Sequence, residues 1–200
     1  VIYTDGATVN NLTATNHGIV TLYAVWEANQ YTVTFKDWDG SVLKTEQVAY
    51  NTGATAPTEP SREGYRFTGW DKTFDVITGD TEITAQYVKT WTVTFKDEDG
   101  TVLKIEIVDE GTGAIAPTEP VKEGHTFAGW NAAFDNVTED TVVTATYIIN
   151  QYTVTFKDWD GSVLKTEQVA YNTGATAPTE PSREGYRFTG WSAAFDKVKG

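Results

Sequence analysis

Hydrophobic residues alternate with threonine in the segment YTVTF at residues 31–35. This period of two predicts a β-strand with one buried and one solvated face. The sequence DWDGS follows, and its Asp-Gly pair predicts a hairpin turn in which Gly40 has a positive φ. The returning strand is expected to run from Val42 to about Tyr50.

On the returning strand, strict alternation cannot place both Leu43 and Val48 on the core face. A three-residue loop at the hairpin tip would set Leu43 opposite Phe35 on the core face. Strict alternation from Leu43 then turns Val48 toward solvent. We therefore expect a β-bulge or a twist between Leu43 and Val48.

The next segment, residues 51–63, has no regular period and contains two prolines. Proline removes a backbone donor and favours extended geometry in the residue before it, so this segment is expected to cross over one face of the sheet. A single helical turn is expected near residues 59–63. The sequence GYRFTGW then predicts a short strand that places Trp70 in the core, and TEITAQY at residues 81–87 predicts a closing strand.

The whole pattern is repeated along the chain. Residues 31–70 return unchanged at residues 152–191, and 26 of these forty residues are kept at residues 91–130. Offsets of 60 and then 61 residues indicate an array of small structural units rather than one large domain. Residues 18–26, GIVTLYAVW, are expected to be a closing strand without the front half of its unit.

Four parts are expected from this periodicity. Residues 1–28 are the C-terminal part of an incomplete repeat, residues 29–89 and 90–149 are repeat units, and residues 150–200 are a repeat unit that lacks its last strand. The links between them have three or four residues and no Gly/Ser run. Neighbouring repeats of the chain are therefore expected to touch and to form a stiff array.

Aromatic residues are expected to supply the cores of these units. The chain of 200 residues has no cysteine, so no disulfide supports units that lie near the lower size limit of a self-supporting core. It has seven Trp, ten Tyr and nine Phe, most of them at repeated positions. The core positions expected are Phe35, Trp70, Tyr87, Phe95, Trp130, Tyr147, Phe156 and Trp191, and the turn positions are Gly40, Gly100 and Gly161.

The charge of the chain argues against a nucleic-acid partner. The formal net charge is −13 at pH 7, whereas a phosphate backbone is bound by clustered Lys and Arg. The charge also drifts between copies, from −3 over residues 31–90 to −8 over residues 91–151 and 0 over residues 152–200. This drift favours a solvated surface over a charged ligand bound by every copy. No apolar run approaches the ~18 residues of a membrane span, so no membrane insertion of this segment is expected.

The repeated pattern resembles the Listeria-Bacteroides repeat, also called the internalin B type B-repeat family. The residues that carry the resemblance are GYRFTGW at 64–70 and 185–191, GHTFAGW at 124–130 and TLYAVW at 21–26. The later closing strands, ITAQYV and VTATYI, depart from the family's ending but keep the alternation. The resemblance implies a mainly β fold of the α+β, β-grasp-like class, found in tandem in the stalks of secreted and wall-attached bacterial proteins.

The resemblance also implies a direction for the chain. In a β-grasp sheet the first and last strands are parallel neighbours, so the chain enters a unit at one end and leaves it at the other. A seven-residue strand spans roughly 23 Å at ~3.3 Å per residue. Three to four such units would then make a rod of roughly 70 to 100 Å.

Acidic motifs and histidines offer little support for a metal site. The repeated motif Asp37-x-Asp39-Gly40 fits a hairpin turn or a calcium loop. An EF-hand loop needs a third acidic position before its glycine and a glutamate six residues after it, and both are missing, so the hairpin is favoured. His17 and His125 lie at unrelated positions of their repeats, which argues against a repeated metal site.

Paired glutamates recur on the proline-rich crossover of each copy, as Glu59 and Glu63, Glu119 and Glu123, and Glu180 and Glu184. Such pairs could serve a glycosidase, but the sequence marks no cleft, and solvated carboxylates are favoured. No Cys is present, and no Ser or His is held in register across all the copies. We therefore expect no catalytic, cofactor-binding or metal-binding residue and no cofactor.

Two tryptophans are the candidates for ligand or inter-unit contact. Trp38 and Trp159 lie at hairpin tips where nothing in the unit obviously covers them, and Glu98 takes their place in the middle copy. An exposed tryptophan can stack on a sugar ring or dock on a neighbouring unit. The alternative is a partly buried anchor of the loop.

The repeats together with the family resemblance predict a non-enzymatic stalk or spacer that projects a functional head. The resemblance implies an extracellular location, either on a bacterial cell surface with attachment to a Gram-positive wall or as a secreted protein. The alternative is a multivalent adhesin module that binds host or matrix glycan or protein through repeated weak contacts. An enzyme is the third possibility. Residues 18–26 are also expected to pair head to tail with the third copy of another chain, because that copy lacks a closing strand.

Overall fold

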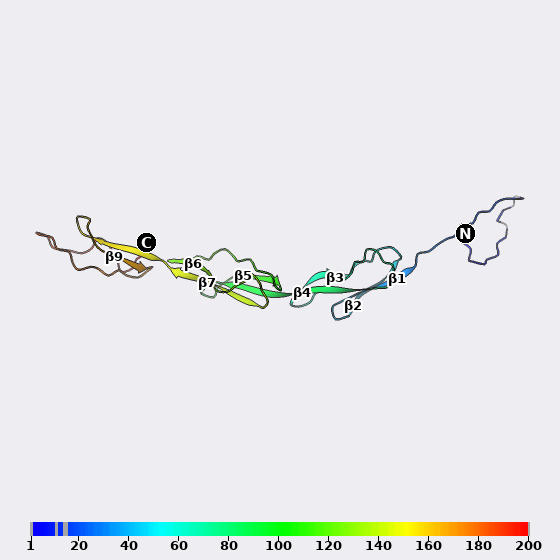
Figure 1. The fold of residues 1–200 in the computed structure, drawn as a ribbon, viewed down its shortest axis with the longest axis horizontal. Helices are drawn as coiled ribbons and strands as arrows, with labels where there is room; N and C mark the ends of the chain where they lie inside the picture. Colours follow the sequence, from blue (N-terminus) through cyan, green and yellow to red (C-terminus); the bar gives the residue numbers. More distant parts are fainter. Residues whose placement is uncertain (1, 11, 14–15, 200) are drawn as a thin grey trace. The chain divides into compact units, whose positions relative to one another are not determined.

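Strands account for all the regular structure in the part of the chain that the computed structural model describes, residues 2–10, 12–13 and 16–199 (Figure 1). They are β1 (Gln30–Lys36), β2 (Val42–Ala49), β3 (Tyr65–Trp70), β4 (Thr81–Lys96), β5 (Val102–Asp109), β6 (His125–Trp130), β7 (Thr141–Ile149), β8 (Gln151–Lys157) and β9 (Val163–Ala170). The mainly β fold class and its tandem arrangement are confirmed. The helical turn expected near residues 59–63 is wrong, because Pro60 disfavours helical geometry in the residue before it.

Two compact units contain the described residues. Unit 1 consists of the residues up to Glu63 together with Phe67–Tyr87, and unit 2 consists of Gly64–Arg66 together with the residues from Val88 onward. The strand β4 runs without a break through the link predicted at residues 88–90, so its first half belongs to unit 1 and its second half to unit 2.

The sheet of unit 1 joins the first and last strands of the first copy. β1 pairs with β2 in antiparallel fashion and with β4 in parallel fashion, with Val33 opposite Thr81 and Lys36 opposite Thr84. The buried face of this sheet follows the alternation of the sequence. Its buried core residues are Val33, Phe35, Val48, Ile77 and Ile83.

The expected bulge is present, but it lies at Leu43 itself. Phe35 pairs with Lys44 and Lys36 pairs with Val42, so Leu43 is the extra residue on β2. Its side chain is 37% exposed, and the prediction that Leu43 lies opposite Phe35 is wrong. A bulge at the start of β2 changes the face of every later residue, which turns Val48 into the core.

The returning strand of each copy (β2, β5 and β9) also directs a lysine and a glutamate toward the crossover segment, and β5 shows this arrangement. The ammonium of Lys104 lies 2.9 Å from Glu106 and donates to the carbonyl of Ile115, while Glu106 accepts from the Ile115 N–H at 2.8 Å. These hydrogen bonds hold the pKa of Glu106 below its ordinary value. The same arrangement recurs at Lys44, Glu46 and Thr55 and at Lys165, Glu167 and Thr176. It fixes one residue of each irregular crossover to the sheet.

Unit 2 repeats the same topology in the middle copy. The second half of β4 pairs with β5 in antiparallel fashion and with β7 in parallel fashion, and β7 pairs with β6 in antiparallel fashion. The buried core residues are Val93, Phe95, Val108, Val137 and Val143. Only Asn150 separates β7 from β8, so the link to the third copy is a single residue.

The third copy forms only the hairpin of β8 and β9. Residues 186–191 match β3 in sequence, yet they form no strand. Both β3 and β6 pair with a closing strand, and the residues after Trp191 include no counterpart of such a strand. Val154 is accordingly only half-buried, whereas its counterpart Val33 is fully buried.

Residues 18–26 form no strand, and the prediction of a closing strand there is wrong. In Figure 1 this segment lies in the part of the chain drawn before the β1 arrow. Its alternating side chains are exposed, Trp26 among them. A closing strand is stabilised by an opening strand of the TVTF type on one side, and residues 1–17 contain no such sequence.

Candidate functional site

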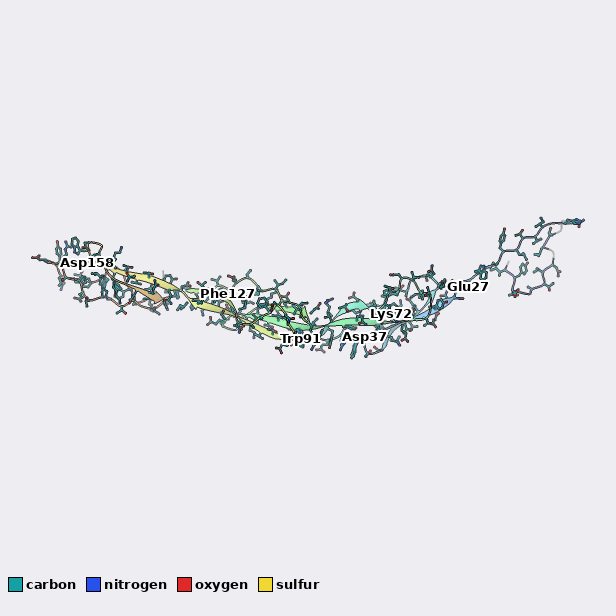
Figure 2. All side chains as sticks on the ribbon, viewed as in Figure 1. Glu27, Asp37, Lys72, Trp91, Phe127 and Asp158 are labelled. Atoms are coloured by element: carbon teal, nitrogen blue, oxygen red, sulfur yellow. The ribbon has the colours of Figure 1, made fainter. Side chains whose placement is uncertain are left out.

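The hairpin tips are built from aspartates that bond to their own turn. The Asp37 N–H donates to the Ser41 carbonyl at 2.8 Å, the Gly40 N–H donates to the Asp37 carbonyl at 2.9 Å, and the Asp39 carboxylate accepts from the Ser41 N–H at 2.9 Å. Bonds from Ser41 hold the pKa of Asp39 below its ordinary value. Gly40 has φ +85°, a conformation that favours glycine, and Figure 2 labels Asp37 at this hairpin.

The same turn recurs in the other two copies. Gly100 and Gly161 have φ values of +90° and +88°. The carboxylates of Asp99 and Asp160 accept from the backbone N–H two residues later. The DxDG motif thus satisfies backbone donors of a hairpin in every copy.

Trp38 and Trp159 lie at these tips and are 53% and 67% exposed. One ring face of each is covered by an arginine of the crossover segment. The guanidinium carbon of Arg62 lies 3.9 Å from the centroid of a Trp38 ring, and Arg183 lies at the same distance from Trp159. This distance suits a cation–π interaction, which ties the hairpin tip to the crossover.

The middle copy replaces this contact with an ion pair. Glu98 takes the place of Trp38, Lys122 takes the place of Arg62, and the Lys122 Nζ lies 2.6 Å from the Glu98 carboxylate. The two positions therefore change together between copies. This paired change is visible in the sequence and could have revealed the partner of Trp38, which the sequence analysis did not identify.

The tyrosines of β4 and β7 each donate to the aspartate that directly follows the opening strand of the same copy. The hydroxyl of Tyr87 lies 2.7 Å from Asp37, and the hydroxyl of Tyr147 lies 2.7 Å from Asp97. Burial and the neighbouring carboxylate raise the pKa of each tyrosine to about 12. Both tyrosines were expected in the core, and the structure places them half-buried at its edge, where they join parallel strands.

Replacing Tyr147 with Phe is expected to lower the free energy of unfolding by about 1 kcal/mol near pH 8 by removing this hydrogen bond. The folded pKa of about 12 lies above the ordinary value of 10.0, so the tyrosine's contribution is complete below pH 10 and is lost as the pH rises toward 12. Urea unfolding from pH 8 to pH 12 should therefore show a shallower alkaline loss in the variant. Tyr23→Phe, at an exposed ring, is the control and should match the unaltered chain, and an unchanged alkaline limb in Tyr147→Phe would contradict the prediction.

The other expected core positions lie around one phenylalanine in each copy. Phe35 and Phe95 are fully buried and Phe156 is nearly so. Each meets a half-buried tryptophan edge to face, with ring centroids 5.0, 5.1 and 4.9 Å apart in the three copies. These tryptophans are Trp70, Trp130 and Trp191.

The structure brings no set of catalytic or metal-binding groups together among the residues it describes. The paired glutamates of the crossover are exposed in all three copies. His17 is exposed, and His125 packs edge to face on Tyr147 with its Nδ1 2.8 Å from the Glu123 carbonyl. No group of three or more His, Cys, Asp or Glu side chains in the described ranges is placed to hold a metal ion.

Sequence comparison relates most of the chain to one repeat family. The family model of the Listeria-Bacteroides repeat domain matches residues 31–90, 91–150 and 152–197. The chain is 32% identical over 193 residues to each of two proteins of Evansella cellulosilytica whose names describe them as membrane proteins. It is 38% identical over 120 residues to Internalin H of Listeria monocytogenes.

These matches cover 86% of the chain for both Evansella proteins and 54% for Internalin H. The chain itself spans only 29%, 22% and 20% of the length of these three curated relatives. Each relative is therefore much longer than the segment described.

Two solved structures show weak similarity. One contains domains 3-4 of Streptococcal High Identity Repeats in Tandem (SHIRT) from a cell surface protein, at 19% identity and a TM-score of 0.21. The other is Mub-RV, at 15% identity and a TM-score of 0.16. Each alignment covers 60% of this chain and 98% of the other. Within the described residues of this chain, no helix has the length and apolar character needed to cross a membrane.

Proposed function

The chain belongs to the Listeria-Bacteroides repeat domain family, and from its strand topology we propose that it is a non-enzymatic stalk segment of a bacterial cell-surface or secreted protein. Its role is to hold a functional head away from the cell envelope. Tandem repeats suit this role because every copy adds length, whereas a catalytic site gains little from being copied in a row.

The observation that carries the proposal is the parallel pairing of the first and last strands of a copy. β1 pairs with the first half of β4, and the second half of β4 pairs with β7. In a parallel pair both strands run the same way, so a chain that enters by one strand leaves by the other at the opposite end. The chain therefore enters each copy at one end and continues into the next copy from the opposite end.

The register gives an expected length for each copy. Val33 lies opposite Thr81, and Val93 is the counterpart of Val33 in the next copy. Twelve residues of β4 separate Thr81 from Val93, which corresponds to an advance of ~40 Å per copy for a straight strand. This exceeds the roughly 23 Å expected from one seven-residue strand, because the closing strand continues past the end of β1.

Small-angle X-ray scattering on arrays of two, three and four complete repeats tests the stalk. The maximum dimension should grow linearly, by ~40 Å for each added copy. A dimension that levels off while the mass increases would show that the copies fold back on one another, and the stalk proposal would then be abandoned.

A multivalent adhesin is the second candidate, favoured by the exposure of Trp38 and Trp159 at the hairpin tips. Changing both to Ala should leave the fold and length of a stalk intact, and it should abolish glycan or host-cell binding by an adhesin. Glu98→Ala at the same position of the middle copy is the matched control. Binding to glycan arrays and to host cells, measured with scattering on the same samples, distinguishes the two functions.

We place the unit boundaries at residues 1–28, 29–89, 90–149 and 150–200, and we propose extracellular display with attachment to a Gram-positive wall. Host or matrix glycans and proteins are the external partners of the adhesin alternative. Head-to-tail pairing of residues 18–26 with the third copy of another chain stays a prediction, tested by the mass in solution at high concentration.

A further inference from the structure

Unit 2 contains two places where one copy of the repeat contacts the next, which we call docking contacts. Each has an equivalent backbone hydrogen bond. In the first, the Thr90 N–H donates to the carbonyl of Gly64 at 2.9 Å. In the second, the Asn150 N–H donates to the carbonyl of Gly124 at 2.9 Å. In both, the glycine that precedes the third strand of one copy meets the residue that leads into the next copy, so the backbone geometry is repeated.

The first docking contact is completed by an ion pair. The Arg66 Nε donates to Asp109 Oδ1 at 2.9 Å, and its Nη2 donates to Asp109 Oδ2. Two parallel bonds between a guanidinium and a carboxylate fix the orientation of both groups. They also hold the pKa of Asp109 below its ordinary value. The pair joins the start of β3 to the end of β5.

The second docking contact uses an aromatic ring instead. The ring of Tyr171 lies against Gly124 so closely that a Cβ built on this glycine would come within 2.0 Å of the ring. The Tyr171 hydroxyl donates to the carboxylate of Glu123. Thr126, at the position of Arg66, is uncharged and donates to the Asn150 side chain at 2.7 Å.

The residues of the two contacts change as matched sets. Thr126 takes the place of Arg66, Ala170 takes the place of Asp109, and Tyr171 takes the place of Glu110. The copy that supplies Asp109 is therefore preceded by a copy with arginine, and the copy that supplies Tyr171 is preceded by a copy with threonine. Neither set could complete the other contact, because arginine would face alanine and threonine would face aspartate.

We propose that these side chains select which kind of repeat can follow another, so that the partner of each docking surface is a neighbouring repeat with the complementary set. The first contact carries Glu63 and Glu110 at the positions of Glu123 and Tyr171, together with the positive charge of Arg66. Two copies like residues 90–149 in succession would keep both glutamates and have threonine in place of this arginine. Like charges at such a position disfavour the wrong neighbour. The proposal rests on the tandem arrangement and is independent of whether the segment is a stalk or an adhesin.

Hydrogen exchange in the full chain tests the proposal through Arg66→Thr, which gives the first contact the residue of the second. The Thr90 amide should exchange roughly three- to tenfold faster, while the Asn150 amide keeps its rate. Asp109→Ala should have a similar effect. Combining the two changes should add little, because each alone already removes the Arg66–Asp109 ion pair. Arg187→Thr is the matched control, since Arg187 is the counterpart of Arg66 in the third copy.

A rescue variant separates matched docking from a general loss of stability. Adding Glu110→Tyr to Arg66→Thr supplies a ring for Gly64, as Tyr171 does for Gly124, and should return Thr90 exchange toward that of the unaltered chain. The Val93 amide, within the core of the middle copy, monitors folding of each variant. Unchanged Thr90 exchange in Arg66→Thr, or exchange in the double variant as fast as in Arg66→Thr alone, would overturn the proposal.

Discussion

Phe95→Ala is expected to unfold most of the middle copy at room temperature. The Phe95 side chain is fully buried, and its ring centroid lies 5.1 Å from both Trp130 and Phe134. Truncating such a phenylalanine costs about 3–5 kcal/mol, because buried contacts are lost and a cavity remains. The core of a domain this small rarely supplies more than about 3–5 kcal/mol in total. One substitution therefore removes most of the stability of the copy.

Hydrogen exchange at Val143 in β7 and the fluorescence of Trp130 measure this loss. The matched control is Ile107→Ala on β5 of the same copy, since Ile107 is 70% exposed and its loss should change stability by less than about 0.5 kcal/mol. A cooperative unfolding transition in Phe95→Ala shifted by less than about 1 kcal/mol would mean that the copy is stabilised chiefly by its neighbours.

The sequence was sufficient to predict the strands because each copy repeats a simple alternation. Phe35 and Val33 face the core as the period of two requires. The position of the bulge could not be read in the same way. The extra residue can belong either to the turn or to the start of β2. When it is Leu43, Lys44 lies on the other face of the sheet, although the order of apolar and polar residues is unchanged.

The partners of the candidate site residues were harder to predict because they lie far apart in the sequence. Trp38 of the hairpin tip meets Arg62 of the crossover segment, and Tyr87 of β4 meets Asp37 beyond the end of β1. Neither contact follows from local periodicity. Comparison of the copies offered a signal for the first pair, since both of its residues change in the middle copy. The comparison offered no signal for the pair of Tyr87 and Asp37, since the tyrosine and the aspartate are the same in both complete copies.

Residues 18–26 show the limit of local pattern. Their composition favours a strand, but a strand gains its stability from neighbours that satisfy its backbone and cover its apolar face. The same dependence explains why residues 186–191 form no strand although residues 65–70 of identical sequence do. In this chain the third strand of a copy is therefore present where a closing strand pairs with it.

Gly124→Ala is expected to destabilise the second docking contact far more than Gly64→Ala destabilises the first. Both glycines have a left-handed backbone, with φ +69° and +74°, so both substitutions carry a similar strain of about 1 kcal/mol. A Cβ at Gly64 meets nothing within 4 Å, whereas a Cβ at Gly124 would overlap the Tyr171 ring. Displacing this ring also breaks its bond to Glu123, which should add about 1–3 kcal/mol.

A double-mutant cycle isolates the steric part of this effect. Tyr171→Ala removes the ring, so adding Gly124→Ala to it should cost only about the 1 kcal/mol of backbone strain measured for Gly64→Ala. Urea unfolding gives these free energies, and exchange of the Asn150 amide reports the contact itself. If Gly124→Ala costs the same with and without Tyr171, the ring does not determine the contact. If instead the cost falls in the absence of the ring, then glycine is required at this position by the neighbouring repeat as well as by its own backbone.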